Sequence, residues 1–414
     1  MKKVGRKSVD GPQPECGCSD YAPPATHNNQ ACANSESKAV ILDPDVAEAF
    51  PDDKAVNQAL RGLLQQFGYG LQHVPPPVML HYLMRGYWIS QAICVAAQLR
   101  IADHLSHGPK SADDLAKAAE VHPRALYRLL RTLASVGIFT EVEPRHFGLT
   151  PMAELLRTGT AESVNALALW NKVDWPSWGQ LLYSITTGKT AFQHVHGMEP
   201  FAYFEHNHEL GTVFNSAMTG YAKVSSMAAV KAYDFNRFTT VVDIGGGHGS
   251  LMAAILQASP TARGIVFDRV NVIEGTRKVM EDAGLLQRCD CVGGNFFESV
   301  PPGGDAYILS SIIHDWDAER SLLILRNCRR AMEMNATLLL VEAVIPPGDI
   351  PSFSKWLDLE MLVCFGGCER TESEYRELLA QAGFQLTRIV PTRTASSIIE
   401  AVAVPSIDEQ VVKK

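Results

Sequence analysis

The sequence predicts an α/β protein with two folded parts, a helical part in front and a sheet with covering helices behind. From about Thr239, apolar β-type runs alternate with helical segments; the runs are TTVVDI, GIVFD, DAYILSSII and TLLLVEAVI. Strands that are apolar along their whole length are typical of a parallel sheet covered on both faces. Before about residue 230, apolar residues recur at helical spacing instead. The two parts therefore meet near residue 230.

The composition excludes several classes of function. The chain has 414 residues, 46% hydrophobic and 20% charged, which leaves room for two domains. A net charge of −8 offers no basic surface for nucleic acid or an anionic membrane. No apolar run approaches the ~18 residues of a membrane helix, and the first residues lack the apolar core of a secretion signal. Nine scattered cysteines do not suggest a disulfide framework, so we expect a cytoplasmic protein with free thiols.

The front part has the pattern of a winged helix. Residues 1–45 are rich in Gly, Pro, Ser, Asn and Ala, which predicts a mobile tail. Helical signals follow, including one long pattern over 79–105. Ser111 with Asp114 resembles a helix N-cap, and Pro123 suits a first helical turn. A third helix and a β-hairpin complete the pattern, which keeps DNA binding open as an alternative that a salt-sensitive gel shift would test.

A glycine-rich loop follows the first strand of the predicted sheet. In VVDIGGGHGS, Gly245 and Gly247 stand between that strand and a helix, although Ser250 makes the loop a weak match to a pyrophosphate cradle. Glycines still let a ligand lie against the backbone, with helix N–H groups behind it. Asp268 ends the next strand, where a carboxylate can bind both hydroxyls of a ribose. Loop, acid and sheet together predict a nucleoside-type cofactor.

Asn295 and Phe296 follow the third strand, in VGGNFFESVP. There the amide can bond a flat base and the ring can cover its face. Taken alone, this stretch favours the interpretation of a core Phe beside a turn Asn, and both interpretations stay open.

A histidine ends the fourth strand, in LSSIIHDW. His314 therefore lies at the edge of the sheet where α/β proteins bind ligands. Glu342 ends the next strand, where an acid is costly unless used, and Glu369 falls in a Gly-rich loop. A carboxylate bonded to one ring N–H leaves the other nitrogen free as a base for a hydroxyl. Asp315 either accepts a substrate proton or caps the following helix.

The segment that joins the two parts is dense in Trp, Phe, Met and His. Such side chains line ligand pockets between domains, but they also form plain interdomain cores. Four of its histidines, at 194, 196, 206 and 208, stand in H-x-H pairs without organised acids, so we expect no metal site.

Taken together, these motifs resemble a known family. VVDIGGGHG, GNFFESVP, SSIIHDWDAERSLLILRNCRRAM, VEAVIP and GGCERTESEYRELLAQAGF are similar to the class I S-adenosylmethionine-dependent O-methyltransferases. The nearest group is the dimeric one of plant caffeate, animal acetylserotonin and bacterial polyketide and phenazine methyltransferases. The likeness covers about residues 75–404. It implies a Rossmann-like seven-stranded methyltransferase sheet, a winged-helix dimerisation domain, a homodimer and no metal.

The resemblance also implies roles for single residues. His314 matches the general base, and Glu342 and Glu369 match its flanking acids. The positions that match cofactor contacts are Gly245, Gly247, Asp268, Asn295, Phe296 and Ser310. Those that match substrate contacts are Asn215, Met218, Asp315, Met361 and Phe365. Two positions depart from the family: Asn295 replaces its usual Asp, and Ser310 replaces a frequent Lys.

We therefore expect methylation of a hydroxyl on a small aromatic or polycyclic secondary metabolite, with S-adenosylmethionine converted to S-adenosylhomocysteine. An S-adenosylmethionine-binding member of the fold with a non-methylating reaction is the alternative. The expected organisation is a tail (1–45), a dimerisation domain (46–170), a linker with the substrate pocket (171–230), a catalytic domain (231–404) and a C-terminal tail (405–414).

Overall fold

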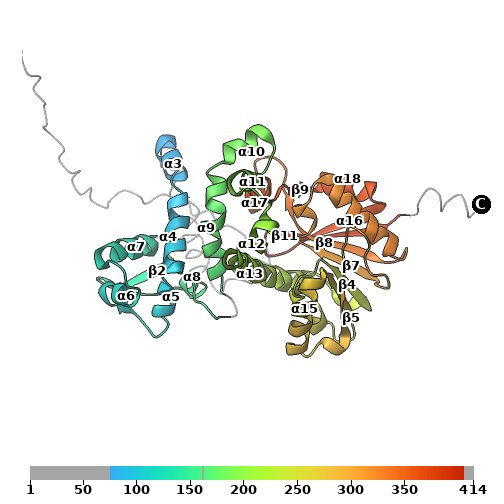
Figure 1. The fold of residues 1–414 in the computed structure, drawn as a ribbon, viewed down its shortest axis with the longest axis horizontal. Coiled ribbons are helices and arrows are strands. Elements are labelled where there is room, and N and C mark those ends of the chain that lie inside the picture. The colour runs from blue at the N-terminus through green and yellow to red at the C-terminus, as the bar shows by residue number, and fades with distance from the viewer. Residues whose placement is uncertain (1–74, 161–162, 405–414) are drawn as a thin grey trace, which may run out of the picture. The chain divides into compact units, whose positions relative to one another are not determined.

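The computed structural model describes residues 75–160 and 163–404 (Figure 1). The predicted tails, 1–45 and 405–414, and the helical signals between residues 46 and 74 lie outside the described residues. No helix within the described ranges is long and apolar enough to cross a membrane.

The front of the described chain is a winged helix with a small sheet in the order β1-β3-β2. Its elements are α3 (Pro76–Leu83), α4 (Tyr87–Gln98), α5 (Ile101–His104), β1 (Lys110–Ser111), α6 (Ala112–Ala118), α7 (Pro123–Ser135), β2 (Phe139–Glu143), β3 (His146–Leu149) and α8 (Pro151–Glu154). The helical pattern over 79–105 is three helices rather than one. Gly86 lies at the first break, and Arg100 adopts a left-handed backbone at the second, with φ of 51°.

The predicted helix starts in this domain are confirmed. The Ser111 hydroxyl accepts a hydrogen bond from the backbone N–H of Asp114 at 3.0 Å, which satisfies one free donor of α6. Pro123 occupies the first turn of α7. The apolar faces of these helices form one core with the β-hairpin, in which Leu115, Leu130 and Phe147 are fully buried.

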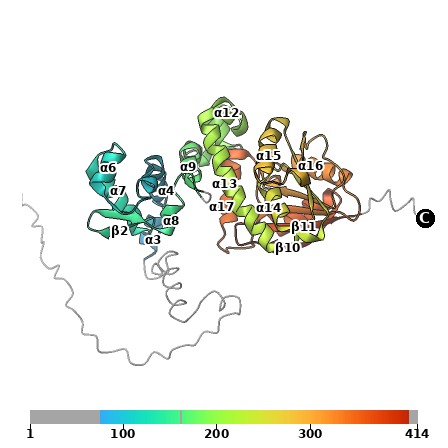
Figure 2. The ribbon, with the colours of Figure 1, turned by 90° about the horizontal axis from the view of Figure 1, so that it is seen from below.

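Five helices connect the winged helix to the sheet: α9 (Asn165–Trp178), α10 (Leu181–Thr187), α11 (Ala191–His196), α12 (Pro200–His206) and α13 (His208–Ala232). The long α13 packs on α9 at one end and on α14 of the sheet domain at the other (Figure 2). Trp170, Phe192 and Phe204 build an aromatic core between them, joined by residues of the C-terminal half such as Val363 and Cys364. This core, called the aromatic wall below, joins the connecting helices to η5 (Met361–Phe365) of the C-terminal domain.

The C-terminal domain is built on a sheet in the order β10-β11-β8-β7-β4-β5-β6, with β9 paired to the far end of β8. Its strands are β4 (Thr240–Ile244), β5 (Arg263–Asp268), β6 (Cys289–Gly293), β7 (Ala306–Ser310), β8 (Thr337–Ile345), β9 (Arg370–Thr371), β10 (Phe384–Pro391) and β11 (Ser396–Ala403). Its helices are α14 (Ser250–Ala258), α15 (Val270–Asp282), α16 (Ala318–Ala331), α17 (Phe353–Glu360) and α18 (Glu372–Gln381); short turns are η2 (Phe235–Arg237), η3 (Leu286–Arg288), η4 (Ile313–Asp315) and η5 (Met361–Phe365).

Helices cover both faces of this sheet, as the apolar strands predicted. One core joins the sheet to α16 and α18 through Ile324, Leu325 and Leu379. The other joins it to α13, α14 and α15. The strands from β4 to β8 are parallel, but β10 and β11 run antiparallel at one edge. Only four residues link β10 to β11, and a parallel pair would need a crossover of a dozen or more.

Candidate active site

The chain turns sharply where β7 ends. Ser311 adopts a left-handed backbone with φ of 54°, a conformation that is uncommon outside glycine and often marks a functional site. Its N–H still donates to the carbonyl of Val341 on the neighbouring β8. The turn leads directly into η4, whose central residue is His314. The His314 side chain is 13% exposed, so it is almost enclosed but still reachable.

Glu342 holds this turn rather than the imidazole. Its Oε1 accepts hydrogen bonds from the backbone N–H groups of Ile312 (3.0 Å) and Ile313 (2.8 Å). Glu342 does not end its strand, as the sequence suggested, because β8 continues to Ile345 and pairs with β9. Glu342 lies one residue beyond the last pair between β7 and β8, which joins Ser310 and Val341. At this point the backbone N–H groups of the turn bond its side chain.

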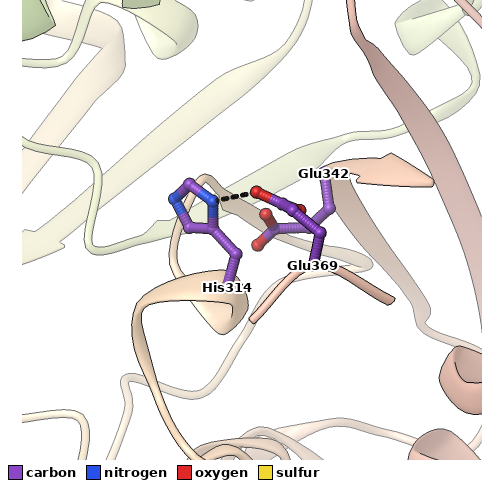
Figure 3. A group of neighbouring side chains, drawn as sticks. All are labelled: His314, Glu342 and Glu369. Atoms are coloured by element: carbon purple, nitrogen blue, oxygen red, sulfur yellow. Dashed lines mark hydrogen bonds and ion pairs between the residues drawn. The ribbon is translucent and has the colours of Figure 1, made fainter. Parts of the chain in front are cut away.

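Glu369 contacts the imidazole directly. Its Oε1 lies 2.7 Å from Nδ1 of His314, and both carboxylates lie on the same side of the ring (Figure 3). Glu369 is itself 4% exposed, and its backbone N–H donates to Oδ1 of Asp358 on α17 at 2.9 Å. Because Glu369 accepts a hydrogen bond from Nδ1–H, the ring is held in one orientation. Nε2 is then the nitrogen that can gain or lose a proton.

Glu342 and Glu369, together with Arg370 and Gly367, form the frame that holds His314. The sequence analysis did not single out Arg370 or Gly367. The buried guanidinium of Arg370 donates to the carbonyls of Ile313 and Trp316, on either side of His314. A Cβ on Gly367 would stand 1.9 Å from the His314 carbonyl oxygen, so only glycine fits there. The sequence offered one signal for Arg370, which is its position directly after Glu369 in the CERTE stretch. An arginine that is buried beside a site residue needs several acceptors, and nearby backbone carbonyls can supply them.

Three carboxylates control the charge of the imidazole. Burial lowers the pKa of His314, but Asp315, Glu342 and Glu369 outweigh this effect and raise it to about 10. The alternative that Asp315 caps the following helix is wrong, because the N-cap of α16 is Asp317. Oδ1 of Asp315 instead lies 3.5 Å from Nε2, the nitrogen that Glu369 leaves free. Burial also raises the pKa of Glu342, to about 7. His314 and Glu342 therefore keep their protons to a higher pH than they would in water. The imidazole must lose one proton before it can act as a base.

The predicted cofactor residues gather beside this turn. Gly245, with φ of +70°, lies against the turn, since a Cβ there would stand 2.5 Å from Cδ1 of Ile312 and 3.6 Å from the Phe296 ring. Gly247 has open space where its side chain would be, and its N–H donates to Oδ2 of Asp268 at 2.8 Å. The glycine loop, the acid and the aromatic ring thus meet at one edge of the sheet.

A buried acid beneath the loop was not singled out from the sequence. Asp243 is 1% exposed, and neither of its carboxylate oxygens has a hydrogen-bond partner among the described residues. Burial and then Asp268 raise the pKa of Asp243 to about 7. Gly246 covers it so closely that a Cβ there would lie 2.7 Å from Oδ2. A ligand with hydrogen-bond donors or positive charge over this loop fits a site with an unsatisfied acid below, as S-adenosylmethionine does.

Asn295 and Ser310 are placed differently. The Asn295 side chain is committed to its own turn, since Oδ1 accepts from the N–H of Phe297 and Nδ2 donates to Glu298. These bonds match the turn interpretation of Asn295, but the residue is also exposed, so its contact with a base stays a prediction. Ser310 is the last residue of β7 and pairs with Val341, directly before the strained Ser311.

The predicted substrate residues divide into two groups. Asn215 and Met218 lie one turn apart on the exposed side of α13. Met361 is buried at the start of η5, and Phe365 at its end contacts the rings of Phe201 and Phe214, at 5.9 and 6.2 Å between centroids. Phe214 directly precedes Asn215, so the second group reaches α13 through this ring.

His314, Glu342 and Glu369 also form the one cluster of possible metal ligands among residues 75–160 and 163–404, with ligand atoms within 4.8 Å. Oε1 of Glu369 already accepts from the ring and Oε1 of Glu342 accepts from two backbone N–H groups, whereas Oε2 of each acid is buried without a hydrogen-bond partner among the described residues. Of the histidines at 194 and 196, the first stacks on Tyr183 and the second contacts Phe192 at a tilt of 43°. The geometry thus fits a positioned imidazole.

Comparison with known proteins places the chain in a family. Residues 178–385 match the O-methyltransferase domain family, and residues 81–159 match the O-methyltransferase dimerisation domain family. The phenazine O-methyltransferase of Lysobacter antibioticus is 47% identical over 79% of this chain and 96% of its own length. The chain belongs to the family of S-adenosylmethionine-dependent O-methyltransferases.

Two further relatives show the range of reactions that proteins of similar sequence are named for. A methyltransferase of calicheamicin biosynthesis, solved with S-adenosylhomocysteine, has a TM-score of 0.74 and 30% identity over 80% of this chain and 99% of its own. The 8-amino-8-demethylriboflavin N,N-dimethyltransferase of Streptomyces davaonensis is 33% identical over 75% of this chain and 91% of its own. Members of similar sequence thus carry names for methylation of oxygen and of nitrogen.

Proposed function

We propose that this protein methylates a hydroxyl group of a small aromatic or polycyclic secondary metabolite, with His314 as the general base. The observation that carries the proposal is the 2.7 Å contact between Glu369 and Nδ1 of His314 at the ligand-binding edge of the sheet. A hydroxyl is a weak nucleophile until it loses its proton, and a positioned base contributes about 10²–10⁴-fold. A neutral amine already has a free lone pair and needs no such base. The imidazole frame therefore favours oxygen as the methyl acceptor.

The chain's own residues would position the two reactants. S-adenosylmethionine supplies, when bound, an electrophilic methyl group on a sulfonium. Asp268 would bind the ribose hydroxyls, and Gly245 and Gly247 would admit the cofactor against the backbone. Asn295 and Phe296 would contact the base, and Ser310 the methionine end. Such positioning is worth several kcal/mol, because it converts a reaction between two molecules into one within a single complex.

On the acceptor side, Nε2 of His314 would take the hydroxyl proton while Glu369 holds the ring and Glu342 holds its turn. Asp315 would share that proton or bond a second polar group of the acceptor. Met218, Met361 and Phe365 would form apolar walls, and the Asn215 amide would offer a polar contact. Residues 171–230 would then be the pocket segment between a dimerisation domain and the catalytic domain at 231–404.

We further propose a homodimer through the exposed apolar face of α3 and α4. Leu83 and Trp88 there are 69% and 55% exposed, which is unusual for such side chains in a monomer. The variant Leu83→Asp with Trp88→Asp should convert a dimer to a monomer in light scattering. Val270→Asp, on the equally exposed Val270 of α15, should leave the mass unchanged. A wild-type monomer, or a dimer that survives the first variant, contradicts this interface.

The test of the function is transfer of labelled methyl from S-adenosylmethionine into a panel of phenols, amines and extract of the source organism. We expect labelled product from the wild type, with a methyl ether in its NMR spectrum, and none from His314→Ala. A labelled N-methyl product would favour the nitrogen chemistry named for the riboflavin relative. Products with unchanged methyl count would favour a non-methylating reaction.

A further inference from the structure

A further pair of acids lies beside the aromatic core of the connecting helices, apart from the His314 cluster. Asp174 on α9 is 9% exposed, and Glu360 ends α17. Asp174 lies one helical turn before Trp178, whose indole donates to Glu360, so both acids lie at the same contact between α9 and α17. Burial, and then Glu360, raise the pKa of Asp174 to about 7. Burial also raises the pKa of Glu360. Two carboxylates in an aromatic core are costly unless something compensates them.

The described residues compensate this pair only in part. Trp178 Nε1 donates to Oε2 of Glu360 at 2.5 Å, but the fully buried Oε1 has no hydrogen-bond partner. The Trp170 indole and the Cys364 thiol oppose the rise of the Glu360 pKa, although neither makes a hydrogen bond to Oε1. Within residues 75–160 and 163–404, no Lys, Arg or His forms an ion pair with Asp174 or Glu360. The pair therefore lacks donors that a bound molecule could supply.

The position of the pair connects it to the acceptor side of the site. Helix α17 carries Asp358, which accepts the backbone N–H of Glu369, and two residues later it carries Glu360. The next residue is Met361, which starts η5, and Phe365 at the end of η5 contacts Phe214. One continuous segment thus links the holder of the imidazole, the proposed acceptor walls and the acid pair.

We propose that Asp174 and Glu360 form the far end of the acceptor pocket and select an aromatic acceptor with a basic nitrogen or amino group. The cationic N–H donors would pair with the unsatisfied Oε1 and with Asp174, while the ring lies against the aromatic wall. This inference rests on the proposed function, because it names the acceptor class of the same site. The acids bind and orient the acceptor and do not touch the transferred methyl group.

The test compares matched probes by calorimetry in the presence of S-adenosylhomocysteine: tyramine against 4-ethylphenol, which has almost the same shape without the amine. In the wild type, tyramine should bind about tenfold tighter or more, as a charged hydrogen bond gives. In the variant Asp174→Asn with Glu360→Gln, the ratio should fall toward one. Glu209→Gln, an exposed acid on α13, removes one charge elsewhere and should keep the wild-type ratio.

A wild type that binds the two probes equally, or binds neither, overturns the proposal, as does an unchanged ratio in the double variant. Circular dichroism and S-adenosylhomocysteine affinity check the fold of the double variant, and Glu360→Gln alone serves if that variant does not fold. The assay measures binding and involves no methyl transfer, so the two proposals can be refuted independently. Selectivity for amines can be absent while methylation depends on His314, and selectivity can be present while methylation does not depend on His314.

Discussion

Two groups of buried acids in this protein are joined by the segment from α17 to β9, and they differ in the basic group that they hold. Glu342 accepts two backbone N–H groups and Glu369 accepts the ring proton of His314, although the second carboxylate oxygen of each has no partner among the described residues. Asp174 and Glu360 receive one indole N–H, and within residues 75–160 and 163–404 no basic side chain forms an ion pair with them. The difference teaches that acids which position a catalytic base enclose that base within the chain, whereas acids that select a ligand are left for the ligand to pair with.

The largest expected effect concerns the fixed group. His314→Ala should lower kcat by about 10²–10⁴-fold, because it removes the base but not the frame that binds the reactants. The affinity for S-adenosylmethionine should stay within about twofold, as fluorescence titration would measure. His208→Ala, on an exposed histidine of α13, is the matched control and should retain full activity. A His314→Ala enzyme with unchanged turnover would remove His314 from the mechanism.

The second prediction concerns the charge on the imidazole. His314 must be neutral to accept a proton, so kcat/KM should rise with pH as His314 deprotonates. The surrounding carboxylates raise its pKa, so this acid limb should lie above 6.5, the ordinary pKa of histidine. Glu369→Gln removes one of these charges and should move the limb down by about 1–3 pH units. Exposed Glu372→Gln should leave it in place; a limb that does not move in Glu369→Gln excludes the ring contact as the cause.

The third and smallest effect concerns the unpaired group and is seen in stability. The folded protein holds the Asp174 proton up to a pKa of about 7, while the unfolded chain releases it near 3.8. Asp174 therefore stabilises the fold less as pH rises from about 4 to 7. Asp174→Asn should remove this loss and be more stable than the wild type at pH 8, by up to roughly 4 kcal/mol. Urea unfolding at pH 4 and 8 measures it, and equal pH dependence in both proteins would contradict the burial of this charge.

Local patterns in the sequence predicted much of the fold and part of the site. Apolar strands, the glycine loop and the capping Ser111 are each fixed by residues within one element, so the pattern carries the information. The sequence also placed His314 beside two acids at the ligand-binding edge of the sheet, but it was wrong to place His314 at a strand end, because β7 ends at Ser310 and His314 follows in η4. It placed Glu342 at the end of its strand and did not separate its role from that of Glu369, because strand length and the turn at Ser311 depend on neighbouring strands.

The contacts that the sequence could not predict join distant segments. Asp174 and Glu360 come from helices far apart in the chain, and each alone looks like an ordinary surface acid on a helix. Arg370 binds carbonyls around His314, a set that exists only after β8 and β9 pair. Asn295 bonds its own turn, which residue type alone did not separate from a ligand contact.

The central claim is that His314 removes the acceptor's proton. The most direct test compares an acceptor whose hydroxyl carries this proton with one whose hydroxyl has already lost it. Methyl transfer would be measured for the acceptor found by label transfer and for a fluorinated analogue whose hydroxyl is already ionised at the assay pH, in wild type and His314→Ala. The account predicts that the variant loses most of its rate on the parent acceptor and far less on the ionised analogue. An equal loss on both would contradict it, because His314 would then act in binding or positioning rather than as a base.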